Sequence, residues 1–172
     1  QPFLDEILGD KSHYRNYLAN ITASVDFIGK GLSAEETPGY FRTGRILETM
    51  YTPESSEAGY ETTKNIHLVF LFMIFPKNEQ LRQMLERGIR FLDIGCGRGD
   101  LIVQLALNFQ NSVFVGVDRN PYGIEEVKNT ISQLGLEKRV SVEKIGGEVL
   151  PYSDEFDMAS MVVTLHEIPP DV

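Results

Sequence analysis

The sequence predicts an α/β fold, a doubly wound parallel sheet preceded by a helical N-terminal extension. Four short apolar runs have the length and content of buried strands. They cover residues 90–94, 112–118, 140–145 and 158–165. Helical patterns follow the first two runs, and a glycine-rich turn from Gly95 to Gly99 joins the first run to its helix. Because strands that alternate with helices form parallel sheets, the sheet is expected in the second half of the chain.

Two regions are expected on this basis, a mainly helical extension over residues 1–77 and the α/β core over residues 78–172. Residues 2–31 carry a helical pattern of apolar side chains. Residues 32–60 mix loop-like prolines and glycines with ambiguous runs, so that segment receives no assignment.

A strongly apolar stretch over residues 66–75 predicts one buried helix that stops before Pro76, because proline cannot continue a helix. The stretch is shorter than the roughly twenty residues of a membrane span, so no membrane segment is expected. The next helix is predicted from Asn78, a favoured capping residue, to Gly88, which leads into the first strand.

Composition limits the class of partner and the compartment. The chain has 172 residues, a formal net charge of −9 and a pI near 4.8, which disfavours nucleic acid as the main partner because phosphates are bound largely through Lys and Arg. The single Cys96 excludes an internal disulfide and fits a reducing, cytoplasmic location. Residues 1–9 show no signal peptide, and Gln1 is not a native initiator, so we expect a processed or cut piece.

The glycine turn indicates a nucleotide-like ligand without phosphate. A dinucleotide fingerprint spaces its glycines as G-x-G-x-x-G, whereas this chain has a glycine at every second position from Gly95, and Asp100 stands where the third glycine belongs. A carboxylate there would repel a pyrophosphate. Asp93 lies two positions before Gly95 and suits a ligand that carries an ammonium group.

A second acid follows the next strand. Asp118 lies nineteen residues beyond Gly99, close to the spacing of about twenty at which a carboxylate reaches ribose hydroxyls in related folds. An ionised carboxylate only accepts hydrogen bonds, and the two adjacent hydroxyls can donate them. A turn aspartate at a strand end is the alternative interpretation.

The pattern D-x-G-x-G-x-G from Asp93 resembles motif I of the class I S-adenosylmethionine-dependent methyltransferases. The same order of features continues over residues 89–168, with the second acid, the segments L-P-Y and F-D, and a fourth strand that ends in L-H-E-I. The resemblance implies a Rossmann-like fold of which this chain holds the first four strands. It also implies S-adenosyl-L-methionine as cofactor and methyl transfer to a small molecule.

The resemblance also implies roles for particular residues. Asp93, Gly95, Cys96 and Gly97 would line the methionine portion of the cofactor, and Gly99 completes the loop. Asp118 would hold the ribose, Arg119 and Asn120 would lie beside the adenine, and Leu165 would face the reacting methyl. Many members place an aspartate after the third strand; here that position is Gly146, and Glu148 is the nearest acid that could replace it.

His166 and Glu167 follow the fourth strand, at the edge where open α/β sheets bind ligands. Our hypothesis is that His166 acts as the general base and that Glu167 orients it. The alternative is that the pair caps the next helix or lines the pocket passively. No metal ligand set is expected.

Two other functions stay open. The chain could be an inactive, methyltransferase-like partner that regulates an active subunit, or, less favoured, an NAD-dependent oxidoreductase. The family's sheet has three further strands after the fourth, and this sequence ends at Val172. We therefore expect a longer parent protein, a second polypeptide or a second copy in a homo-oligomer to cover the exposed sheet edge.

Overall fold

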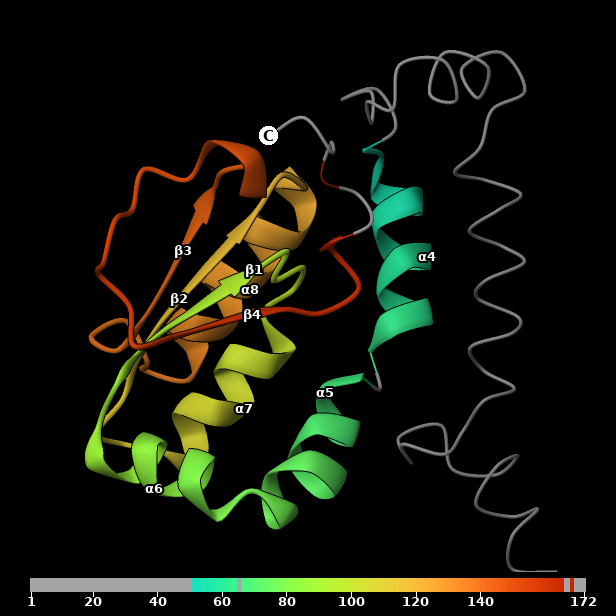
Figure 1. Cartoon of the computed structure of the whole chain (residues 1–172). Coiled ribbons are helices and arrows are strands. Elements are labelled where there is room, and N and C mark those ends of the chain that lie inside the picture. The colour runs from blue at the N-terminus through green and yellow to red at the C-terminus, as the bar shows by residue number, and fades with distance from the viewer. Residues whose placement is uncertain (1–50, 65, 166–167, 169–172) are drawn as a thin grey trace, which may run out of the picture. The chain divides into compact units, whose positions relative to one another are not determined.

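The computed structural model describes residues 51–64, 66–165 and 168 of the chain (Figure 1). The chain divides into two compact units, residues 1–70 and residues 71–172, and each is described by itself. The helix predicted over residues 2–31 lies outside the described residues, as does most of the unassigned segment.

Two helices of the first unit lie within the described residues 51–64 and 66–70. Helix α4 (Pro53–Thr63) begins at a capping box, in which the Ser55 N–H donates to Thr52 Oγ1 at 3.1 Å and the Thr52 N–H donates to Ser55 Oγ at 2.9 Å. This helix accounts for the last residues of the segment that received no assignment. Helix α5 (Ile66–Val69) follows as a single short turn.

The apolar stretch before Pro76 differs from the prediction of one buried helix. Helix α5 continues as a π-helical turn, η2 (Phe70–Ile74), and then as a 3₁₀ turn, η3 (Phe75–Lys77). Pro76 lies in the first turn of η3, where its missing N–H costs nothing. The wider π turn breaks the single apolar stripe of an α-helix, and within η2 Phe72 is 63% exposed.

The second unit is built on a four-stranded parallel sheet in the order β3-β2-β1-β4. The strands are β1 (Arg90–Ile94), β2 (Val113–Asp118), β3 (Val140–Lys144) and β4 (Met158–Met161). Its helices are α6 (Glu79–Arg87), α7 (Asp100–Asn108) and α8 (Pro121–Gln133), with a 3₁₀ turn η4 (Gly147–Val149). This is the Rossmann-like α/β architecture that the alternation of strands and helices predicts.

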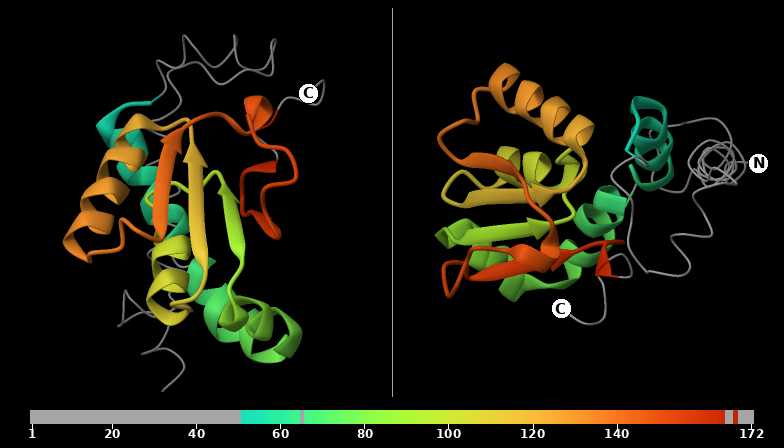
Figure 2. Two further views of the ribbon diagram at one scale, coloured as in Figure 1. Left: turned by 90° about the vertical axis from the view of Figure 1, so that its left-hand side faces the viewer. Right: turned by 90° about the horizontal axis from the view of Figure 1, so that it is seen from above.

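The two faces of the sheet are covered differently. Helices α7 and α8 lie on the same side of the sheet (Figure 2), where Phe91 and Phe114 are fully buried. On the other face, Ile94, Val117 and their neighbours pack against partly buried side chains of the segment that connects β3 to β4. These side chains are Ile145, Leu150, Tyr152 and Phe156. Both faces thus contribute to the core that supports the strand ends.

Strand β4 is shorter than predicted. It ends at Met161, whereas the apolar run continues to Leu165. Val163 has a φ of +59°, which a β-branched side chain rarely adopts and which no strand can contain. The chain therefore turns at Val163 instead of extending the sheet.

Candidate functional site

The glycine loop lies at the carboxyl end of the sheet, between β1 and α7. The N–H groups of Gly95 and Cys96 both donate to the carbonyl oxygen of Val117 on β2, at 2.8 and 3.0 Å. The Gly99 N–H closes the turn by donating to the Cys96 carbonyl at 2.8 Å. These bonds fix the loop against the end of the neighbouring strand, before α7 begins at Asp100.

The three glycines of this loop face different surroundings. A Cβ on Gly95 would lie 1.9 Å from Thr164 Oγ1, so the segment after β4 contacts the loop at that point. A Cβ on Gly99 would lie 2.2 Å from Val127 Cγ2, so Gly99 allows α8 to pack closely. None of the described residues lies within 4 Å of the Cβ position of Gly97. Of the three glycines, Gly97 therefore has the open Cβ position.

Asp93 is a buried carboxylate on β1, with only 4% of its surface exposed. In the sheet register it stands between Gly116 of β2 and Ser160 of β4. The Ser160 hydroxyl donates to Asp93 Oδ1 at 2.6 Å. Burial raises the pKa of Asp93 to about 6; the Ser160 hydrogen bond opposes that shift and the negative charge of Asp118 adds to it.

Asp118, the last residue of β2, is held by the backbone. Its Oδ2 accepts from the Gly97 N–H and its Oδ1 accepts from the Asn120 N–H, both at 2.7 Å. Burial raises the pKa of Asp118, and hydrogen bonds from the N–H groups of Asn120, Gly97 and Arg119 oppose the shift. A carboxylate has about four lone-pair sites, so these three N–H donors leave at least one of them for a ligand.

Cys96 packs against β2 at Gly116 and feels the charges of both acids. Its Sγ lies 2.8 Å from the position of a Cβ on Gly116, so the side chain fills the space that this glycine leaves. Burial raises the pKa of the Cys96 thiol, and the charges of Asp118 and Asp93 raise it further. The thiol therefore stays protonated, and Cys96 is a small packing residue. Its coupling to both acids shows that Asp93 and Asp118 share one electrostatic environment.

The other residues predicted to bind cofactor form two contacts beyond β2. Asn120 caps α8, because its Oδ1 accepts from the N–H groups of Tyr122 and Gly123 at 3.0 and 3.4 Å. Arg119 forms an ion pair with Glu148 of η4. The structure thus brings together Arg119 and Glu148, which were each predicted separately to bind cofactor.

An ion pair that sequence reasoning missed connects the loop to α8. The Nε of Arg98 lies 2.7 Å from Glu126 Oε2, and the Arg98 side chain is only 16% exposed. Burial raises the pKa of the adjacent Asp100 to about 6; the positive charge of Arg98 opposes this and Glu126 adds to it. Arg98 thus carries a positive charge near the two acids Glu126 and Asp100, and its ion pair with Glu126 links the loop to α8.

The predicted catalytic residues His166 and Glu167 lie outside the described residues. Leu165 immediately precedes them and is 69% exposed. Two further residues near the loop, Ser160 and Thr164, were not predicted. Their contacts depend on the pairing of β4 beside β1, which neither residue reveals by its type or spacing.

Within the described part of the chain, no three histidine, cysteine or acidic side chains gather closely enough to hold a metal ion. Over the same residues, every helix is too short or too polar to cross a membrane.

Comparison with known proteins identifies a matching family, a curated relative and similar solved structures. A family described as "Methyltransferase domain" matches residues 85–170. The 27-O-demethylrifamycin SV methyltransferase of Amycolatopsis mediterranei (strain S699) is 32% identical over 87 residues, which are 49% of this chain and 31% of that protein. The chain therefore spans about a third of the length of this curated relative.

Two solved structures are also similar. PKMT2 from Rickettsia typhi, in complex with AdoHcy, is 32% identical with a TM-score of 0.40, over 44% of this chain and 15% of that one. The S-adenosylmethionine-dependent methyltransferase SibL, in its apo form, is 23% identical with a TM-score of 0.47, over 92% of this chain and 44% of that one.

Proposed function

This chain belongs to the methyltransferase domain family, among the class I S-adenosylmethionine-dependent enzymes, and from that premise we propose that it supplies the cofactor-binding half of an enzyme that methylates a small molecule. S-adenosyl-L-methionine is the cofactor of this family. The observation that carries the proposal is the pair of carboxylates at the ends of adjacent parallel strands, Asp93, which is buried, and Asp118, which is partly exposed.

The residues present fit this cofactor. It carries an ammonium group, a sulfonium and a ribose diol, and no phosphate. Asp93 would receive the ammonium group, and Asp118 would accept from the ribose hydroxyls with lone pairs that its backbone contacts leave available. The missing side chain at Gly97, whose Cβ position is open, would let the cofactor approach the loop closely. Glu148, fixed by Arg119, is the proposed acceptor for the adenine amino group.

The chain's own contribution to the reaction is alignment. When bound, the cofactor supplies an electrophilic methyl group on a positively charged sulfur. Asp93 and Asp118 would hold it at two separated points, and the burial of Asp93 keeps water from that carboxylate. We propose that Leu165 borders the acceptor and that His166, oriented by Glu167, takes the proton from the acceptor's nucleophile.

Two lines of support favour a small-molecule acceptor. The relative that matches half of this chain carries a rifamycin compound in its name. The net charge of −9 disfavours a nucleic acid.

In the described residues β4 pairs only with β1, so its outer edge can receive a strand from a further polypeptide or a second copy. Light scattering after gel filtration would detect such an assembly.

Calorimetric titration with S-adenosylmethionine, S-adenosylhomocysteine and NAD tests the proposal. We expect the wild-type chain to bind both methionine-derived ligands and not NAD. Asp118→Asn should lose most of this binding, whereas Glu137→Gln, which changes an exposed acid distant from the loop, should keep it. A folded wild-type chain that binds neither methionine-derived ligand would favour the inactive partner, and binding of NAD alone would favour an oxidoreductase.

The acceptor and the base require a separate assay in the full-length protein. Transfer of a radiolabelled methyl group to a panel of hydroxyl, amine and carboxyl compounds should identify a small acceptor. His166→Ala should then reduce turnover about a hundredfold while cofactor affinity is kept. Unchanged turnover in that variant would eliminate His166 as the base.

A further inference from the structure

Ser160 of β4 contacts the buried Asp93 carboxylate from the side opposite to β2. The two residues are partners in the sheet register, and the Ser160 hydroxyl donates to Asp93 Oδ1 at 2.6 Å. The register partner of Asp93 on β2 is Gly116, which has no side chain to offer. The Ser160 hydroxyl is the one side-chain donor that the structure gives Asp93 within the described residues.

The groups around Asp93 otherwise oppose its charge. Burial disfavours the ionised form, and Asp118 on β2 adds a second negative charge. Cys96, which packs over Gly116, stays a neutral thiol. A carboxylate in such surroundings keeps its charge only if a donor stabilises it, and a hydroxyl bond to a charged group is stronger than one between neutral groups.

We propose that Ser160 is a positioning residue for cofactor binding. Its hydroxyl holds Asp93 Oδ1, which leaves Oδ2 oriented for the ammonium group of the cofactor, and it keeps the carboxylate ionised until that group arrives. This inference rests on the proposed function. It adds to it a side chain on the edge strand β4 that acts through Asp93 and touches no ligand itself.

The first test uses the ligand-free protein. Carboxyl carbon-13 resonances assigned by comparison with Asp93→Asn give the titration of Asp93 directly. We expect Ser160→Ala to move the pKa of Asp93 upward from the wild-type value, and Ser160→Thr, which retains a hydroxyl at the same position, to restore it. Ser141→Ala, on exposed surface of β3, serves as the matched control and should leave it unchanged.

The second test measures S-adenosylhomocysteine affinity by calorimetry between about pH 5 and about pH 8. At the alkaline end, Ser160→Ala should weaken binding about three- to tenfold, the loss of one hydrogen bond. Its affinity should also begin to fall at a higher pH than in the wild type. Ser160→Thr should return both the affinity and the pH profile to wild-type values.

The outcomes separate this inference from the proposed function. If the wild type binds no methionine-derived ligand, the proposed function fails, and the carbon-13 titration still decides whether Ser160 controls the charge of Asp93. If Ser160→Ala lowers only the melting temperature and both the Asp93 titration and the pH profile of binding are unchanged, Ser160 is merely structural and the inference is overturned.

Discussion

Asp93 and Asp118 stand at the ends of neighbouring strands, yet they are held by different parts of the chain. Backbone N–H groups of the loop and of the segment after β2 hold Asp118. A single side-chain hydroxyl from β4 holds Asp93, and burial brings its pKa to about 6. A carboxylate held by several backbone N–H groups keeps its donors whatever the neighbouring side chains are, whereas one held by a single hydroxyl loses its donor in one substitution.

The largest expected effect is a loss of stability on substituting Gly95, and Gly97 in the same loop provides the comparison. Gly95→Ala should destabilise the protein by about 3 kcal/mol, because the new Cβ would collide with Thr164 and Gly95 already has a φ of +77°. Gly97→Ala should cost only about 1 to 2 kcal/mol, because its φ of +55° is unfavourable but its Cβ would enter open space. Equal shifts in chemical denaturation midpoints would contradict this difference.

Removal of the backbone-held acid is the next largest effect. Asp118→Ala should weaken S-adenosylhomocysteine binding about a hundredfold, since it removes charged hydrogen bonds to the ligand and leaves the N–H groups of Gly97 and Asn120 without their acceptor. Calorimetry gives the affinity. If Asp118→Ala weakens binding less than Asp93→Asn does, Asp93 contributes more to cofactor affinity than Asp118, and the expected order is wrong.

The pH dependence of S-adenosylhomocysteine affinity tests the role of Asp93, the acid that a side chain holds. Because the ammonium group requires ionised Asp93, affinity should fall about tenfold per pH unit as the pH drops below about 6. Asp93→Asn should bind weakly and lack this dependence. A wild-type affinity that stays constant to about pH 4.5 would show that Asp93 does not receive the charge.

Cofactor affinity should rise with pH, whereas the stability of the ligand-free protein should fall as the pH rises. The pKa of Asp93 is raised in the folded state, so between its ordinary value and about 6 the folded protein binds the proton that the unfolded chain has released. Unfolding free energy should therefore decrease as the pH rises through that interval. Asp100 contributes a second decrease of the same sign, so Asp93→Asn should lessen the slope measured by urea denaturation and not remove it.

The smallest expected effect is at the ion pair beyond β2. Arg119→Ala should change stability by less than about 1 kcal/mol, because the Arg119 side chain is 39% exposed and solvent screens its charge. Its effect on cofactor affinity should be about twofold and should vanish in Glu148→Gln, where the partner charge is already gone. A double-mutant cycle by calorimetry checks this coupling.

The sequence predicted those features that depend on local pattern. The β1 and β2 runs are apolar and buried, and the strand–glycine–helix order placed Asp93 and Asp118 at one edge of the sheet. Features that depend on neighbours in space were missed. Ser160 matters because β4 lies beside β1 with Asp93 and Ser160 in register, and neither spacing nor residue type encodes that alignment.

Two errors have local causes. Proline predicts the end of a helix at Pro76, but a proline in the first turn can also begin a new helical turn, as it does in η3. The apolar, β-branched run after Met161 predicts a longer strand, and the left-handed backbone at Val163 prevents it. Asn120 and Pro121 form an ordinary helix start, so the capping role of Asn120 was readable from the sequence.

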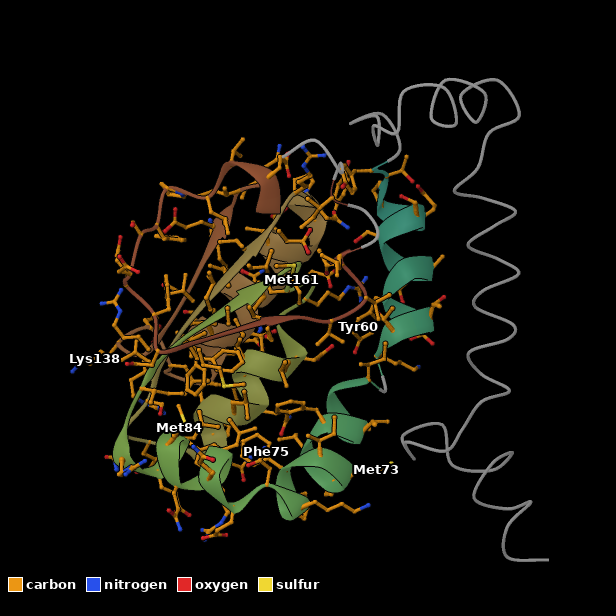
Figure 3. All side chains as sticks on the ribbon, viewed as in Figure 1. Tyr60, Met73, Phe75, Met84, Lys138 and Met161 are labelled. Atoms are coloured by element: carbon orange, nitrogen blue, oxygen red, sulfur yellow. The ribbon has the colours of Figure 1, made fainter. Side chains whose placement is uncertain are left out.

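The turn at Val163 has a consequence for redesign. The turn brings Thr164 against Gly95. The limit of the glycine loop on that side therefore follows from a main-chain torsion angle and not from the size of a side chain. Met161, the last residue of β4, is labelled in Figure 3. Trimming side chains around the loop would leave that boundary in place, and a variant library would have to alter the length or the glycine content of the connection itself.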